Sequence, residues 1–265
     1  TYQQRKILKR PSSNYGYVTD SNFGIRMIDF TSPNNPTWTV YTASPTYPCD
    51  GNDIAFIQSN NYAIVTNVTH YLIFNISPIT PSLSYTYALA NVNGVFVSGS
   101  LAYFGTNNGL SIIDLTTLSS PNARGSQSIL GVQRKLKVVG NYAYVASSNY
   151  GLAILDISNP DSIGTPIYKK TNSAYAVAVN NDHTYIADNT EGLVIVDVSD
   201  PTSLVGLINQ DPDLKFYRNS TAMVVWASDN AILGRYHYSN GSSSNIFVIV
   251  QQILTKEIAL GIGYD

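Results

Sequence analysis

The stretch Gly192-Leu-Val-Ile-Val-Asp-Val-Ser-Asp-Pro201 decides the fold, because it recurs along the chain. Close copies share its apolar run and its aspartate: Gly24-Ile-Arg-Met-Ile-Asp-Phe-Thr-Ser-Pro33, Gly109-Leu-Ser-Ile-Ile-Asp-Leu-Thr116 and Gly151-Leu-Ala-Ile-Leu-Asp-Ile-Ser-Asn-Pro160. Weaker copies are His70-Tyr-Leu-Ile-Phe-Asn-Ile-Ser-Pro78 and Phe247-Val-Ile-Val-Gln251. The chain is therefore built from an internal repeat.

A polar marker residue ends each apolar run and sets the period of the repeat. The markers are Asp29, Asn75, Asp114, Asp156, Asp197 and Gln251, at spacings of 46, 39, 42, 41 and 54 residues. Upstream of each run lies a second strand-like piece, such as Asn141-Tyr-Ala-Tyr-Val145, and further apolar pieces precede and follow the pair. Each unit therefore holds four short strands, and a period of about 40 to 45 residues is typical of a β-propeller blade.

The marker residues are predicted to be structural rather than catalytic or metal-binding. The glycine ahead of the run suits a turn with positive φ, the marker can accept backbone N–H groups, and the following proline stops the strand. Equivalent sites spread around a ring cannot converge on one ligand. We therefore assign turn roles to Asp29, Asn75, Asp114, Asp156 and Asp197.

The composition excludes several classes of protein. The 265 residues carry a net charge of −2, so no basic surface for nucleic acid is expected. Only 12% of the residues are charged, and 26 Asn, 29 Ser and 20 Tyr supply the polarity instead. No apolar run reaches the roughly 20 residues that a transmembrane helix needs. Because the sequence begins at Thr1, we expect a matured product or an excised segment.

The run Gly-Leu-x-Ile-x-Asp-x-Ser-x-Pro resembles the LVIVD-repeat family of β-propellers, and Tyr17-Val-Thr-Asp20 and Ile64-Val-Thr-Asn67 are similar to the related YVTN surface-layer repeats. The resemblance covers five units and weakens at the sixth, where Gln251 replaces Asp. It implies a propeller of a kind found in secreted or cell-surface proteins, without a family-wide catalytic motif.

The predicted fold is all-β: residues 1–265 form one domain, a six-bladed β-propeller of four-stranded antiparallel blades. The expected blades are residues 1–42, 43–88, 89–130, 131–170, 171–210 and 211–265. The expected first strands of these blades are Lys6–Lys9, Asp53–Ile57, Gly94–Val97, Lys135–Val139, Tyr175–Val179 and Thr221–Trp226.

Four Asn-x-Ser/Thr sequons are candidates for N-linked glycans. Asn67, Asn219 and Asn240 fall in connections between strands, where a glycan would be exposed. Asn75 stands at a marker position, so we expect it to be less fully occupied.

The connections that enter the first strands would form the mouth of the propeller, a common place for ligands. The candidate mouth residues are Asp50, Asp53, Arg134, Tyr175, Lys215, Tyr217 and Arg218. Their charges are mixed and no His or carboxylate trio converges, so we predict no metal, no cofactor and no catalytic residue. For Cys49, in the same set of connections, we expect a buried or idle thiol, with an intermolecular partner as the next option.

These features favour a non-catalytic structural or adhesive interaction module outside the cell or on its surface, with partners that include copies of itself. One alternative is a carbohydrate-binding propeller, because tyrosine rings can stack on sugars; a hydrolase is the third. Either Thr1–Arg10 or the apolar edge Glu257–Gly263 is expected to contact another copy, which would give a filament or a surface layer.

Overall fold

The computed structural model describes residues 4–11, 13–20, 24–32, 34–41, 53–57, 61–77, 81–180, 182–202, 204, 220–228, 231–239, 243–251 and 260–261. The regular elements of these ranges are all β-strands. Within the same ranges we find no helix long and apolar enough to cross a membrane. The chain packs as two compact units, Thr1–Ser126 and Gln127–Asp265.

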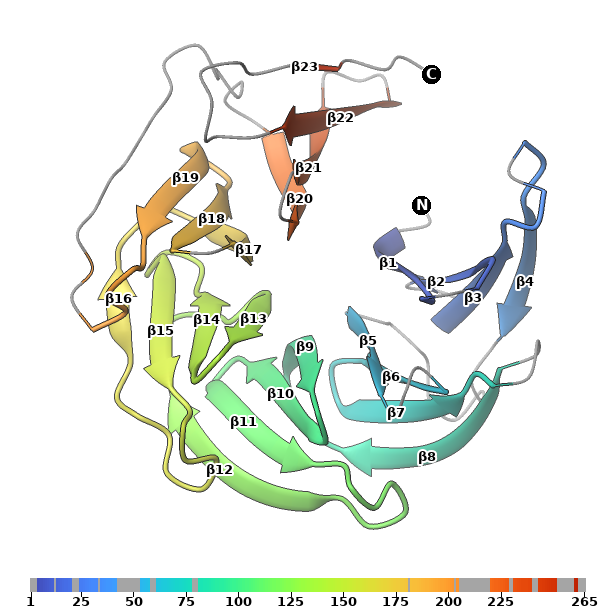
Figure 1. Cartoon of the computed structure of the whole chain (residues 1–265), viewed down its shortest axis with the longest axis horizontal. Coiled ribbons are helices and arrows are strands. Elements are labelled where there is room, and N and C mark those ends of the chain that lie inside the picture. Colours follow the sequence, from blue (N-terminus) through green and yellow to red (C-terminus); the bar gives the residue numbers. More distant parts are fainter. Residues whose placement is uncertain are drawn as a thin grey trace. The chain divides into compact units, whose positions relative to one another are not determined.

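The first unit contains three antiparallel four-stranded sheets in which consecutive strands are neighbours (Figure 1). The first blade consists of β1 (Gln4–Lys9), β2 (Tyr15–Asp20), β3 (Gly24–Asp29) and β4 (Thr37–Tyr41). The second consists of β5 (Asp53–Ile57), β6 (Tyr62–Thr66), β7 (His70–Asn75) and β8 (Ser82–Ala88). The third consists of β9 (Val92–Ser98), β10 (Leu101–Thr106), β11 (Gly109–Asp114) and β12 (Asn122–Ser128), whose last residues belong to the second unit.

The second unit contains the fourth and fifth blades and a further sheet. The fourth blade consists of β13 (Leu136–Val139), β14 (Tyr142–Ala146), β15 (Leu152–Asp156) and β16 (Ile167–Lys169). The fifth consists of β17 (Ala174–Asn180), β18 (His183–Asp188) and β19 (Gly192–Asp197). The last sheet consists of β20 (Ser220–Ser228), β21 (Ala231–Ser239), β22 (Ser243–Gln251) and β23 (Leu260–Gly261).

The prediction of six four-stranded blades is wrong. Five blades of three or four strands carry the repeat, and in the described residues the sheet of the fifth consists of β17, β18 and β19. The last sheet is built differently, from three strands of nine residues each and a strand of two residues. No Gly-Leu pair precedes β22 and Gln251 replaces the marker aspartate, so the local signals that stop a repeat strand after five or six residues are missing.

The positions of the first strands agree well with the sequence. The range Asp53–Ile57 coincides with β5, and the other predicted first strands lie inside or within one residue of β1, β9, β13, β17 and β20. In the expected fifth blade, residues 171–210, Leu204 is not part of a strand, and residues 205–210 lie outside the described residues.

The blades pack face to face through the apolar side chains of their middle strands. In the first unit, one buried cluster joins the first and second blades and contains Tyr17, Ile25 and Phe74. A second cluster joins the second and third blades through Tyr71 and Phe104, whose ring centroids are 5.0 Å apart. In the second unit, the fourth and fifth blades share a cluster of Tyr144, Leu152, Ile154, Ile186, Val194 and Val196. Because both faces of a blade are covered, the third strands can be apolar at nearly every position.

Candidate functional site

The marker side chains cap the turn that follows each third strand. Asp29 Oδ1 accepts hydrogen bonds from Thr31 N at 2.8 Å and from Thr31 Oγ1 at 2.5 Å. The same bond to the backbone N–H two residues further on is made by Asn75, Asp114, Asp156 and Asp197, at 2.8 to 2.9 Å. These carboxylates and the amide are therefore engaged in local turn structure.

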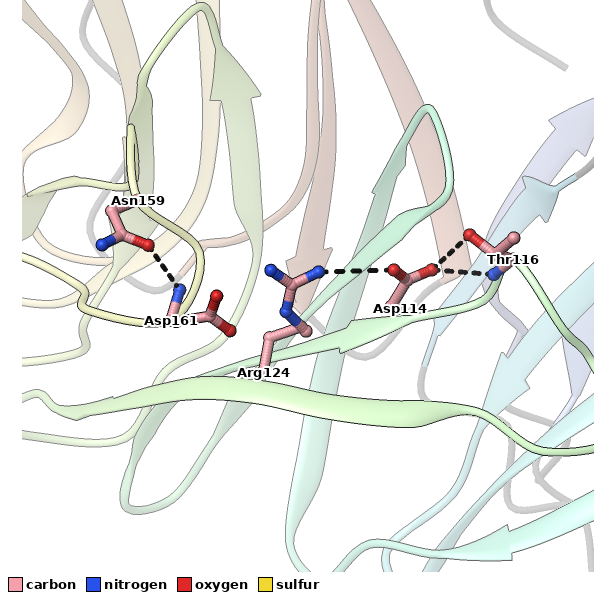
Figure 2. A network of polar contacts seen from close by, with 5 residues as sticks. All are labelled: Asp114, Thr116, Arg124, Asn159 and Asp161. Atoms are coloured by element: carbon pink, nitrogen blue, oxygen red, sulfur yellow. Dashed lines mark hydrogen bonds and ion pairs between the residues drawn. The ribbon is translucent and has the colours of Figure 1, made fainter.

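Figure 2 shows the marker turn of the third blade, where an arginine is added to the same arrangement. Asp114 Oδ1 accepts from Thr116 N and Oγ1, and Asp114 Oδ2 lies 3.4 Å from Arg124 Nη1 on the neighbouring strand. A turn beyond β15, also drawn there, has the same spacing: Asn159 Oδ1 accepts from Asp161 N at 3.1 Å. Both arrangements stabilise turns, and in the first the Asp114 carboxylate is fully engaged by Thr116 and Arg124.

The turn hydrogen bonds shift the acidity of the marker carboxyls. Hydrogen bonds from the side chain and the backbone of Thr31 lower the pKa of Asp29, and those from Thr116 lower the pKa of Asp114. For Asp156 and Asp197 the backbone N–H two residues on is the larger cause of a lowered pKa. Each carboxylate therefore favours the folded state when it is ionised.

Acidification should accordingly reduce the stability of the protein. Because the folded-state pKa values lie below the ordinary value of 3.8, the contribution of these carboxylates is present above that value and is lost as the pH falls through the lowered pKa. Thermal unfolding followed from about pH 6 to about pH 2 should show this loss. The variant in which Asp29, Asp114, Asp156 and Asp197 are all replaced by Asn should keep the Oδ1 acceptor, as Asn75 does naturally, and lose less stability on acidification. Equal acid sensitivity of both proteins would contradict the assignment.

A second capping position, which the sequence did not reveal, lies at the end of the second strand. Asn67 Oδ1 accepts from Thr69 N at 2.9 Å and from His70 N at 2.6 Å. Asp188 Oδ1 accepts from Thr190 N at 2.8 Å and from Glu191 N at 3.0 Å, while its Oδ2 accepts from Ser173 N at 2.6 Å. Burial raises the pKa of Asp188, but the accepted hydrogen bonds outweigh burial and lower it overall. The common signal is an Asx residue at the end of the apolar second strand or directly after it.

This position changes the interpretation of the sequons. The Asn67 side chain is only 3% exposed, so the exposure on which a glycan there was expected does not apply to it. Asn75 is half-buried at the end of β7, and its Oδ1 accepts from Ser77 N at 2.9 Å. Asn219 and Asn240 lie outside the described residues.

Among the predicted mouth residues, Asp53 is buried and is bound to groups of two other blades. Its side chain is 2% exposed, and its Oδ1 lies 2.7 Å from Lys6 Nζ of the first blade. Its Oδ2 accepts from Val95 N of the third blade at 3.0 Å. One carboxylate therefore links the first strands of three consecutive blades. The predicted residues Asp50, Lys215, Tyr217 and Arg218, as well as Cys49, lie outside the described residues.

The structure brings the remaining two predicted mouth residues together. The guanidinium carbon of Arg134 lies 4.8 Å from the centre of the Tyr175 ring, a cation–π distance. Arg134 Nε donates to Ser148 Oγ at 3.4 Å, and Ser148 Oγ donates to Val132 O at 3.0 Å. Ser148 also forms an isolated antiparallel bridge with Ala174. Residues of both the fourth and the fifth blade therefore fix the position of Arg134. We call Arg134, Ser148 and Tyr175 the arginine site.

An exposed apolar surface adjoins the arginine site. Leu130 is 55% exposed and Tyr150 is 40% exposed, and the rings of Tyr150 and Tyr168 are 6.4 Å apart. Leu130 N donates to the Tyr168 hydroxyl at 2.8 Å. Tyr150 belongs to the same turn as Ser148, so this turn contacts both the apolar surface and the arginine.

The described residues contain no group of three or more His, Cys, Asp or Glu side chains that could hold a metal ion. The chemistry that they offer at the arginine site is recognition by charge, hydrogen bonding and aromatic contact.

Comparison with known proteins identifies the repeat and the fold. The family model described as the LVIVD repeat matches residues 91–127, 131–165 and 172–209, which confirms the resemblance over the third, fourth and fifth blades. No curated protein matches the chain in sequence.

Many solved structures share the fold. The crystal structure of the RRP9 WD40 repeats has a TM-score of 0.73 at 11% identity, over 98% of this chain and 82% of that one. The computationally designed Ika8 protein has a TM-score of 0.65 at 10% identity, over 97% and 73% of the two chains. The N-terminal domain of Nup159 has a TM-score of 0.51 at 14% identity, over 80% and 60%. At these identities the likeness shows a propeller fold alone.

Proposed function

We propose that this chain, an LVIVD-repeat protein with a β-propeller fold, is a non-catalytic structural or adhesive module that works outside the cell or on its surface. Its partners are proteins, including further copies of itself, which assemble into a filament or a surface layer. The observation that carries the proposal is the absence of protecting charges on two outer strands, β4 and β8.

The fourth strand of a blade has an edge that can accept another strand. Natural edge strands usually carry charges or proline that discourage such pairing. The sequences of β4, Thr-Trp-Thr-Val-Tyr, and of β8, Ser-Leu-Ser-Tyr-Thr-Tyr-Ala, contain neither. Addition of a strand from a partner at such an edge supplies main-chain hydrogen bonds without desolvating charges. The two outer strands therefore suit protein association.

A non-catalytic role is supported by the hydrogen bonds that the carboxylates accept from backbone N–H groups. Every described marker side chain accepts a turn N–H, and Asp53 and Asp188 are buried and hydrogen-bonded to backbone N–H groups. A general base or nucleophile must instead reach a substrate. These acids are better explained as structural groups.

Self-association provides the test of the proposal. A lysine placed at exposed Ser84 on β8 or exposed Thr39 on β4 should oppose strand addition, because the charge on an outer strand would be desolvated when a partner strand pairs with it. We expect the wild-type chain to assemble with rising concentration in analytical ultracentrifugation and electron microscopy. Ser84→Lys together with Thr39→Lys should weaken assembly by about tenfold or more. Ser119→Lys, in an exposed turn, adds the same type of charge off the edges and should have no effect. A wild-type chain that stays monomeric at high concentration would overturn the proposal.

An extracellular protein should also carry glycans on accessible sequons. Peptide mass spectrometry of protein from its native source should find Asn75 modified and Asn67 largely bare, because the Asn67 amide is buried in its turn. A fully modified Asn67 would show that the described turn does not form before modification. Bare Asn75, Asn219 and Asn240 would remove the support that glycosylation gives to an extracellular location.

Carbohydrate binding is the second candidate. The tyrosines of the strands mostly serve the core, since Tyr17, Tyr71, Tyr103, Tyr144 and Tyr185 are buried. Tyr150 favours this candidate, because it is 40% exposed and its ring lies near that of Tyr168. Binding to a neutral sugar array that is lost in Tyr150→Ala would support it.

A further inference from the structure

The Arg134 guanidinium is held in place by groups that do not neutralise it. The Tyr175 ring lies against its face at 4.8 Å and Ser148 Oγ accepts from Nε. Both partners are uncharged, so they fix the plane of the guanidinium without neutralising its positive charge. Side-chain entropy that a free arginine would lose on binding is thus already lost.

No carboxylate of the described residues pairs with Arg134. Two carboxylates in these ranges pair with other cations, Asp53 with Lys6 and Asp114 with Arg124. Glu191, in a turn of the fifth blade, has a raised pKa because of burial and the nearby Asp188 carboxylate. The two terminal nitrogens of the guanidinium, Nη1 and Nη2, form a fork that matches the two oxygens of a carboxylate.

We propose that the arginine site binds a carboxylate carried by a segment of a partner protein. Arg134 would donate two parallel N–H···O bonds from Nη1 and Nη2 to an aspartate or glutamate of the partner. This inference rests on the proposed role as a protein-binding module and adds a second contact to it, separate from the outer strands β4 and β8.

The apolar surface beside the site distinguishes a protein from a small anion. Leu130 and Tyr150 are exposed within the connections that flank the Ser148 turn, and Tyr168 supports both. Arg and Tyr are the residue types that dominate binding energy in protein interfaces, where apolar anchors surround a charged contact. The ligand that fits is therefore a peptide with an acidic residue next to an apolar one.

Peptide arrays test this inference directly. The probe is a set of nonapeptides that each contain one Asp or Glu flanked by Leu, Phe or Tyr, together with twins in which Asn or Gln replaces the acid. The full chain should bind acidic peptides at least about tenfold more tightly than their amide twins, and the difference should shrink with added salt. Arg134→Gln should abolish the preference, and Arg134→Lys should weaken binding by about tenfold because a lysine cannot form the fork. Tyr150→Ala should reduce binding of acidic and amide peptides alike.

The control is Arg124→Lys, which changes an arginine that is already paired with Asp114 and keeps the net charge. It should bind the acidic peptides as the wild type does. Equal binding of acidic and amide peptides, unchanged binding by Arg134→Gln, or binding to glucuronic acid oligosaccharides in place of peptides would each overturn the inference. If peptides do not bind while the chain still self-associates through its outer strands, this inference fails and the proposed function stands.

Discussion

Replacing Gly151 with alanine should lower the free energy of unfolding by about 3 to 5 kcal/mol, the largest effect that we expect of any single substitution. Gly151 opens the repeat run of the fourth blade with φ of +83°, a left-handed conformation in which a side chain is strained. An added Cβ would also overlap the backbone at Lys169 O and Thr171 N. Backbone atoms cannot move aside as a flexible side chain can, so β15 and β16 would have to separate.

Gly140 supplies a matched control for this substitution. Its φ is +55°, also left-handed, but nothing lies within 4 Å of the place where a Cβ would stand. Gly140→Ala should therefore cost only the conformational strain, about 1 kcal/mol. Chemical denaturation of both variants measures the difference. Similar losses in the two variants would mean that conformational strain alone, without the close approach of the backbone, explains why glycine is needed at position 151.

Removal of the Asp53 carboxylate is the second large effect that we expect. Asp53→Ala leaves Lys6 Nζ without its counter-ion and Val95 N without its acceptor. Breaking a buried pair from one side costs about 3 to 5 kcal/mol, and the lower end applies here because the Lys6 side chain is 28% exposed. We therefore expect a loss of about 3 kcal/mol in the free energy of unfolding.

The opposite deletion should cost less. In Lys6→Ala the Asp53 carboxylate keeps its hydrogen bonds to Ile54 N and Val95 N, and Lys6 gives up a partly exposed position. A loss of about 1 kcal/mol is expected. Denaturant titrations of both variants against the wild type give the comparison. If Lys6→Ala were the more damaging change, the backbone bonds of Asp53 would not be the main reason for its burial.

The strand order could be read from the sequence because the signals for it are local. A glycine, an apolar run and an Asx residue within about ten positions determine where a third strand begins and ends. The last sheet lacks these signals, and the prediction of a sixth repeat blade there was wrong. The burial and the partners of Asp53 could not be predicted from the sequence. Lys6 and Val95 are distant from it in the chain and reach it only through the packing of the blades.

The sequon at Asn67 illustrates a different limit. A sequon is a local pattern that an enzyme recognises for glycan attachment at the Asn side chain, whereas the turn after β6 buries Asn67 and uses its amide oxygen to accept from Thr69 N and His70 N. Alignment of Asn67 with Asp188, which stands at the end of the corresponding strand β18, is the signal that would have shown this use. The sequence placed Arg134 and Tyr175 in the same mouth but did not predict their contact, because a cation–π contact depends on the directions of the two side chains.

The marker turns have a consequence for how such chains can evolve. Donor and acceptor of each cap are two residues apart on the same segment, so the bond travels with its gene segment when a repeat is duplicated, deleted or exchanged. A new copy brings its own turn and needs only apolar faces to stack on its neighbours. The Asp53 bridge is the reverse, because it ties the first three blades to one order. Recombination should therefore be tolerated among the later repeats more readily than between the first and the third.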